Sequence, residues 1–197
     1  MAPIQYADPH LLLNPPTVSR PRFGVLLGDP AHTHRLILQS IFSQITRGER
    51  VCLIVGDNLL ELYLLSRALR RYGLDPKEAL KSIEYSRSFT CNELHHCILR
   101  LDMFKAKYWS ALYIQGLLNG FYDENIRYAD GDRKLIEILK HLREIASGGN
   151  SVIVTVSRPP TGIDRQSFVN RVVLSSNAYW QTCTESARLP YEQMSLL

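Results

Sequence analysis

The segment GDPAHTHR, residues 28–35, follows the apolar run FGVLL at 23–27 and precedes a helical pattern. A buried strand that runs into glycine and then into a helix is a common local arrangement for binding a phosphate group. A phosphate loop of the pattern G-x-x-x-x-G-K-[ST] supplies backbone N–H groups for the phosphate oxygens, a lysine for their charge and a hydroxyl for magnesium. The first question is therefore whether this segment can hold a nucleotide.

Aligned from Gly28, the segment has Thr33 in place of the second glycine, His34 in place of the lysine and Arg35 in place of the hydroxyl residue. A neutral histidine does not replace an ammonium group, and a guanidinium cannot ligate magnesium. The later strand that should end in a metal-side aspartate ends in Gln115. We expect no ATP hydrolysis and no cofactor, whether the site was lost or never existed. Arg35 and the first-turn N–H groups could still hold an anion.

A second candidate segment, residues 157–171, carries Arg158, Arg165 and Arg171 among proline, glycine and serine. Such a loop suits contacts with DNA phosphates, each of which adds about one unit to the salt dependence of binding. The alternative is a solvated loop whose arginines pair with Asp164 or with nothing. The net charge of +4 permits nucleic-acid binding without requiring it.

Cysteine and histidine also gather at Cys91, His95, His96 and Cys97. Zinc needs four converging ligands, usually from two halves of a motif, and the sequence offers no second half. We therefore expect no metal site, with Cys97 in the buried stripe of a helix. The four cysteines form no C-x-x-C pair, which favours reduced, buried thiols in a cytosolic protein.

Apolar runs typical of strands alternate with amphipathic helical patterns along the chain. The strands are expected at 23–29, 50–57, 82–88, 110–118 and 150–157, and a terminal hairpin at 171–184 with its turn near Ser176 and Asn177. We expect an α/β fold with a mostly parallel sheet flanked by helices, ending in the antiparallel hairpin. Its ligand crevice would lie at the carboxyl ends of the strands.

The chain divides into three expected parts: an extended N-terminal arm at 1–22, a core domain at 23–186 and a flexible tail at 187–197. A content of 45% apolar and 21% charged residues fits one globular domain. No apolar stretch reaches membrane-spanning length, so a membrane is not an expected partner.

Four blocks of the chain together resemble the RecA-type ATPase core, nearest to the RecA/Rad recombinase paralogues. These blocks are 23–58, 80–99 with its Arg-Ser-Phe-Thr run, 111–126 with its Phe-Tyr-Asp-Glu stretch, and 139–159. The resemblance covers roughly residues 23–180 and implies a RecA-like fold of the P-loop NTPase type. Besides the phosphate loop, the chain departs from the family at Ser157 and Arg158, where recombinases often carry Asn-Gln. The family's oligomerisation motif is not evident in the arm.

Residues 193–197 resemble the pentapeptide with which bacterial repair proteins bind the DNA sliding clamp, Gln-Leu-Ser/Asp-Leu-Phe. The residues concerned are Gln193, Met194, Ser195, Leu196 and Leu197. A glutamine amide at the rim of a pocket and apolar residues inside it would explain this spacing. The alternative is a tail that docks on its own sheet through Leu196 and Leu197.

Together these resemblances imply a non-catalytic RecA-like accessory protein of DNA repair, recombination or translesion synthesis. Inactive members of the superfamily, such as the Shu-complex proteins, keep the core and bind DNA or a recombinase. The expected partners are DNA and a sliding clamp, recombinase or translesion polymerase subunit, in the cytoplasm with the nucleoid. Two alternatives are a divergent ATPase that uses Arg35 or a partner's lysine, and a regulator that binds proteins alone.

Overall fold

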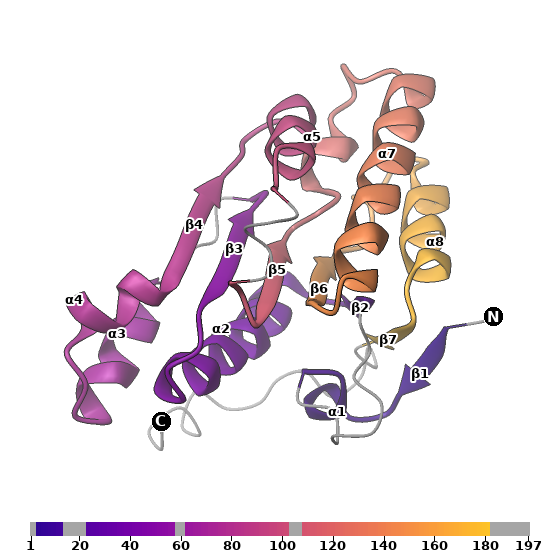
Figure 1. The fold of residues 1–197 in the computed structure, drawn as a ribbon. Helices are drawn as coiled ribbons and strands as arrows, with labels where there is room; N and C mark the ends of the chain where they lie inside the picture. Colours follow the sequence, from indigo (N-terminus) through magenta and orange to yellow (C-terminus); the bar gives the residue numbers. More distant parts are fainter. Residues whose placement is uncertain (1–2, 14–22, 58–61, 103–107, 182–197) are drawn as a thin grey trace.

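Seven parallel strands form one sheet in the computed structural model, which describes residues 3–13, 23–57, 62–102 and 108–181. Their spatial order is β1-β7-β2-β6-β5-β3-β4 (Figure 1). The strands are β1 (Ile4–Tyr6), β2 (Phe23–Leu27), β3 (Val51–Val55), β4 (Ile83–Arg87), β5 (Ala111–Gln115), β6 (Ser151–Val156) and β7 (Ala178–Gln181). All five strands predicted from the apolar runs are present, and neighbouring strands of the sheet pair in parallel.

Helices cover both faces of this sheet (Figure 1). They are α1 (Pro9–Leu13), α2 (Pro30–Thr46), α3 (Leu62–Arg71), α4 (Pro76–Ala79), α5 (Cys91–Leu99), α7 (Tyr128–Ser147) and α8 (Gln166–Ser175), with the 3-10 turns η1 (Leu80–Ser82) and η2 (Asn119–Tyr122). α1 to α4 pack on one face, and α5, α7 and α8 pack on the other. The strands β2, β3 and β5 are buried at every residue because both of their faces are covered. None of the helices in the described ranges has both the length and the apolar character needed to cross a membrane.

The predicted helix that opens at Thr90 is confirmed with its capping box. Thr90 Oγ1 accepts from the backbone N–H of Glu93 at 3.1 Å, and the Glu93 carboxylate accepts from the backbone N–H of Thr90 at 3.1 Å. This reciprocal pair satisfies two of the N–H groups at the helix start and fixes where α5 begins.

The predicted terminal hairpin is wrong. Its first half folds as α8, and its second half is β7, which lies parallel to β2. The β-branched residues of this segment suggested a strand, but Phe168, Val169 and Val172 are spaced so that one helical face is buried. β7 also runs parallel to β6 with β2 between them, so the chain needs a crossover connection from β6 to β7, which α8 provides.

The predicted N-terminal arm contributes to the sheet. β1 pairs in parallel with β7, and Ile4 N donates to the carbonyl of Asn177 at 2.9 Å. Trp180 Nε1 on β7 donates to the carbonyl of Ala7 at 3.2 Å, which ties the chain between β1 and α1 to the last described strand. Residues 3–13 therefore belong to the folded unit.

Candidate functional site

The loops that follow β2, β3, β5 and β6 meet at one edge of the sheet, because all parallel strands end on the same side and β6 lies between β2 and β5. Gly28 N donates to the carbonyl of Val156 at 3.0 Å, and Gly56 N donates to the carbonyl of Gln115 at 2.8 Å. The sequence positions proposed for a degenerate nucleotide site are thus brought to the same edge.

The connection between β2 and α2 consists of only Gly28 and Asp29. α2 begins at Pro30, so Thr33, His34 and Arg35 lie within the helix and not in a loop. A phosphate loop needs several non-helical residues whose N–H groups converge on the anion. The described segment is too short to wrap a phosphate in this way.

The start of α2 already carries a negative group. The Asp29 carboxylate accepts from His32 N at 3.1 Å, and Pro30 has no N–H to offer. A carboxylate at this end of a helix takes the place in which a bound anion would be stabilised. At the anion site expected from Arg35 and the first-turn N–H groups, the Asp29 carboxylate therefore already occupies the position of an anion.

His32 brings no cation to this position. Its ring is tilted against that of Trp180, with 5.6 Å between centroids. Burial lowers the pKa of His32 below its ordinary value of 6.5; the Asp29 carboxylate opposes this shift, and Arg35 adds to it. The neutral form is thus favoured near neutral pH.

His34 contacts Asp57, the second residue after β3. Their Nε2 and Oδ2 atoms are 3.0 Å apart, and each side chain is only 4% exposed. A Cβ at position 116 would lie 2.5 Å from Asp57 Oδ2, so only glycine allows the carboxylate to come this close to β5. The sequence analysis did not single out Asp57, and the signal that could have revealed it is an aspartate two residues after a buried strand.

Gln115 is buried at the end of β5, with 1% of its surface exposed. Neither atom of its side-chain amide has a hydrogen-bond partner among the residues that the structure describes. The neighbouring Thr155 on β6 is also buried and accepts from Gly116 N through Oγ1 at 2.8 Å. We refer to His34, Asp57, Gln115 and Thr155 as the buried polar cluster. It contains His34 and Gln115, two of the positions that the sequence suggested for a degenerate nucleotide site.

The three arginines predicted to contact DNA do not converge. Arg158 is exposed in the loop after β6. Arg165 donates through Nη2 to the carbonyl of Ile126 at 2.6 Å, and its guanidinium lies 5.4 Å from the ring centroids of both Tyr128 and Phe168.

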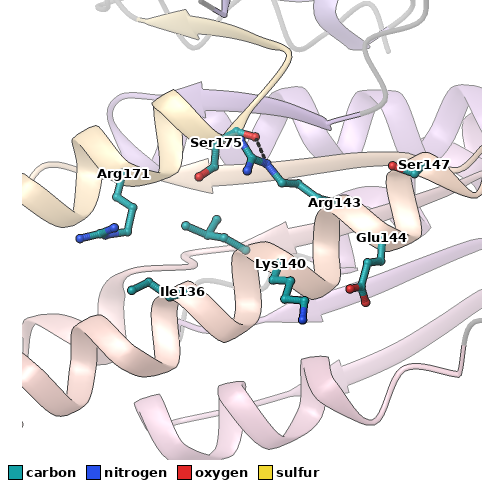
Figure 2. Close-up of a pocket in the computed structure, with 8 residues that line it drawn as sticks. Ile136, Lys140, Arg143, Glu144, Ser147, Arg171 and Ser175 are labelled. Carbon is teal, nitrogen blue, oxygen red and sulfur yellow. Dashed lines mark hydrogen bonds between the residues drawn. The ribbon is translucent and has the colours of Figure 1, made fainter. Parts of the chain in front are cut away.

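Arg171, the third of these arginines, lies within α8 and forms an ion pair with Asp132 of α7 at 2.9 Å. Asp164, the partner considered from the sequence, makes no ion pair with any residue in the described ranges. Arg171 also borders a groove of about 570 Å³ between α7 and α8 (Figure 2).

This α7–α8 groove is lined by Ile136, Leu139, Lys140, Arg143, Glu144, Ser147, Arg171 and Ser175. Arg143 Nε donates to the carbonyl of Ser175 at 2.9 Å, a contact that joins the two helices (Figure 2). Three basic side chains line the groove against one carboxylate, that of Glu144. The sequence did not indicate this surface because it forms only when two helices far apart in the chain pack together.

The cysteine and histidine side chains of α5 have separate partners. His95 Nε2 lies 2.6 Å from Glu137 Oε2, Cys97 Sγ lies 3.1 Å from Ser86 Oγ, and Cys91 is fully buried. In the part of the chain that the structure describes, no group of three or more histidine, cysteine or acidic residues is placed to hold a metal ion.

The predicted clamp-binding residues 193–197 and the rest of the tail lie outside the described residues. No family model matches the chain, and no curated protein matches it in sequence. What the protein does must therefore be inferred from its own residues.

Proposed function

We propose that this chain is a non-catalytic RecA-like accessory protein of DNA repair, recombination or translesion synthesis that binds DNA and repair partners. The observation that carries the proposal is the buried contact of 3.0 Å between His34 and Asp57. In a working site the residue at position 34 would face a phosphate. Here its Nε2 lies against a carboxylate of its own chain, and each of the two side chains is only 4% exposed.

The RecA-like part of the proposal is supported by the sheet. The blocks that resemble the family contain β2, β3, β4, β5 and β6, and these strands pair in one parallel sheet. The loops after β2, β5 and β6 meet at the edge where ligands bind in open α/β folds. This arrangement suits the family, although many other functions use a similar one.

Calorimetric titration with ATP and Mg²⁺, together with a phosphate-release assay, tests the absence of catalysis. We expect neither saturable heat nor hydrolysis, because the connection of Gly28 and Asp29 is short and α2 carries its own carboxylate. The alternative ATPase predicts hydrolysis that disappears in Arg35→Ala. Such a result would overturn the proposal.

For DNA, the supporting surface is the α7–α8 groove, which offers Lys140 and Arg143 on α7 and Arg171 on α8. Arg158 is exposed in the loop after β6 and is a separate candidate contact. Basic side chains of this kind contact phosphates without reading sequence, so binding should be electrostatic and sensitive to salt. Arg165 contributes less, since its guanidinium is engaged within the fold.

Fluorescence anisotropy with single-stranded and duplex oligonucleotides over a range of salt concentrations tests this surface. Replacing both Lys140 and Arg143 by alanine should reduce the slope of log K against log salt by about two units, one for each lost phosphate contact. Arg70→Ala is the matched control, because Arg70 is exposed on α3, on the opposite face of the sheet. Unchanged slopes would show that DNA is bound elsewhere than in the groove, and no DNA binding at all would leave a regulator that binds only proteins.

The proposed partners are a sliding clamp, through residues 193–197, and a recombinase or translesion polymerase subunit. Deleting 193–197 should abolish clamp binding in a pull-down and leave the melting temperature unchanged. A clear drop in that temperature would favour the tail that docks on its own sheet. We propose localisation with the nucleoid only as a consequence of DNA binding, so a protein that binds no DNA should not localise there.

A further inference from the structure

A second hollow lies at the carboxyl ends of β3, β4 and β5, away from the α7–α8 groove. It has a volume of about 400 Å³, within the range of small-ligand sites. Its lining includes Asp57, Ser88, Phe89, Asn119, Tyr122 and Asp123. We call it the β-edge pocket.

The charge of the β-edge pocket is negative. Asp57 and Asp123 supply two carboxylates, and no basic residue stands among the described residues that line it. The cations nearby are outside the lining: Arg87 lies 4.7 Å from the ring centroid of Phe89, and His34 contacts Asp57 from α2. A ligand with a positive group is therefore favoured here, and a phosphate is repelled.

The start of α5 does not reverse this preference. The Glu93 carboxylate accepts from the backbone N–H groups of Phe89 and Thr90 at 2.7 and 3.1 Å. Thr90 Oγ1 accepts from Glu93 N in turn. Two N–H groups at this helix start are thus occupied by the Glu93 carboxylate and a third by the Thr90 hydroxyl, and the negative charge of Glu93 disfavours an anion there.

Ser88 supplies an independent sign of a ligand. It lines the pocket, is 1% exposed, and its Oγ has no hydrogen-bond partner among the described residues. Its backbone is held in place, because Ser88 N donates to the carbonyl of Val55 at 2.9 Å. A buried hydroxyl without a partner is costly, and a bound donor group would satisfy it.

Two aromatic rings favour a planar cation. Phe89 is 64% exposed at the pocket, and Tyr122 is held by a hydrogen bond of 2.7 Å from its hydroxyl to the carbonyl of Ser157. Burial raises the pKa of Tyr122 above its ordinary value, so its hydroxyl stays protonated and keeps this bond. A guanidinium can stack on such rings while its five N–H groups reach carboxylate, hydroxyl and amide oxygens.

We propose that the β-edge pocket binds the guanidinium of an arginine side chain presented by a protein partner. Asp123 supplies the exposed carboxylate, and Asp57 supplies the buried one that His34 already contacts. Ser88 Oγ and the Asn119 amide oxygen supply further acceptors, and Phe89 supplies the ring face that Arg87 does not cover. The inference goes beyond DNA binding and is independent of it, since the α7–α8 groove has the opposite charge.

An NMR titration of the full chain tests this site, with the peptide acetyl-Gly-Arg-Gly-amide as the probe. We expect saturable shifts of the backbone amides of Ser88, Asn119 and Gly120, with millimolar affinity. The same peptide with citrulline in place of arginine has a similar shape without the charge and should cause no such shifts. Agmatine, a small guanidine without a peptide backbone, is titrated separately as a second probe.

The matched variants are Asp123→Asn and Asp130→Asn. Asparagine at position 123 keeps an oxygen that can accept from Asn125 N, so the local turn is retained. Asp123→Asn should weaken peptide binding about fivefold, the scale of an exposed ion pair, whereas Asp130 is exposed on α7 and its variant should bind normally.

The outcomes separate the possible ligands. Binding of the arginine peptide with the loss in Asp123→Asn supports the proposal. Binding of agmatine but not of the peptide would overturn the protein partner. Equal shifts with the citrulline peptide, the same shifts with Mg²⁺ alone, or no saturable shift would overturn the guanidinium site, and none of these results depends on DNA binding.

Discussion

The contact between His34 and Asp57 is the residue-scale feature with the largest expected effect on stability. Both side chains are withdrawn from water, and neither ring nitrogen of His34 makes a hydrogen bond within the described part of the chain, so the 3.0 Å approach of Nε2 to Asp57 Oδ2 is a close polar contact. A buried polar group is costly when its neighbours of opposite character are removed. The same closeness that supports a non-catalytic role therefore makes the pair important for folding.

Replacing His34 with alanine should lower the free energy of unfolding by about 2 to 4 kcal/mol, because it leaves the buried Asp57 carboxylate without its neighbour. Urea denaturation followed by circular dichroism measures this loss. Gln39→Ala is the control: Gln39 is exposed on the same helix, and its loss should stay within about 0.5 kcal/mol. A loss in His34→Ala as small as that of the control would contradict the importance of the contact.

Cys52 gives a prediction about pH. Burial raises the pKa of its thiol from 9.0 to about 12, with a smaller contribution from the Glu84 carboxylate. Above pH 9 the unfolded chain loses this proton and the folded chain keeps it, so stability falls as the pH rises from 9 towards 12.

Urea titrations between pH 8 and pH 10 should show this fall, by about 1.4 kcal/mol at one pH unit above the unfolded pKa. Cys91, whose pKa burial raises to about 11, adds a similar contribution. In Cys52→Ala the protein is less stable at every pH, but the fall across this range should be smaller. An unchanged fall would show that Cys52 ionises equally in both states.

The helix α8 is an element that the sequence did not reveal. Two positions on it, two residues apart, test which of its faces is buried. Val172 is fully buried and Leu174 is 67% exposed. Residues two apart lie on the same face of a strand but on nearly opposite faces of a helix. A hairpin strand would therefore expose or bury both residues together, whereas the helix buries Val172 and exposes Leu174.

Val172→Asp should destabilise the protein by about 3 kcal/mol or more because it buries an unpaired charge, whereas Leu174→Asp should change stability by about 0.5 kcal/mol or less. Thermal and urea unfolding of the two variants supply the comparison. Equal losses in both would contradict a helix at this place.

Most other elements could be predicted because their signals are local. Runs such as Val51–Val55 are apolar throughout, and the Thr90 and Glu93 pair marks a helix start within four residues. The sites could not be predicted in the same way. The α7–α8 groove and the β-edge pocket join segments that meet only after the sheet has its order, and His34 and Asp57 lie 23 positions apart, with no pattern that links them.

Two surfaces of opposite charge lie on different parts of the molecule. The α7–α8 groove is basic, and the β-edge pocket at the carboxyl ends of the strands is acidic. A nucleic acid and an arginine of a protein partner could thus bind at once without competing for one surface.

The parallel pairing of β1 with β7 should affect both the stability of the protein and its tendency to self-associate. Removing residues 1–7 deletes β1, exposes the backbone edge of β7 and leaves Trp180 Nε1 without the carbonyl of Ala7. We expect a lower melting temperature and self-association at high concentration, since open strand edges pair with other chains. Calorimetry and light scattering measure the two effects. A truncated chain that melts and scatters like the full one would show that β1 contributes nothing.

The same pairing has a consequence for synthesis. A ribosome makes residues 4–6 before residues 178–180, and the pairing of Ile4 with Ala178 spans 174 positions of the chain. The strand β1 must therefore stay unpaired until the whole intervening segment has emerged. Chaperones that shield such waiting segments should therefore matter more for this protein than for one built from local hairpins.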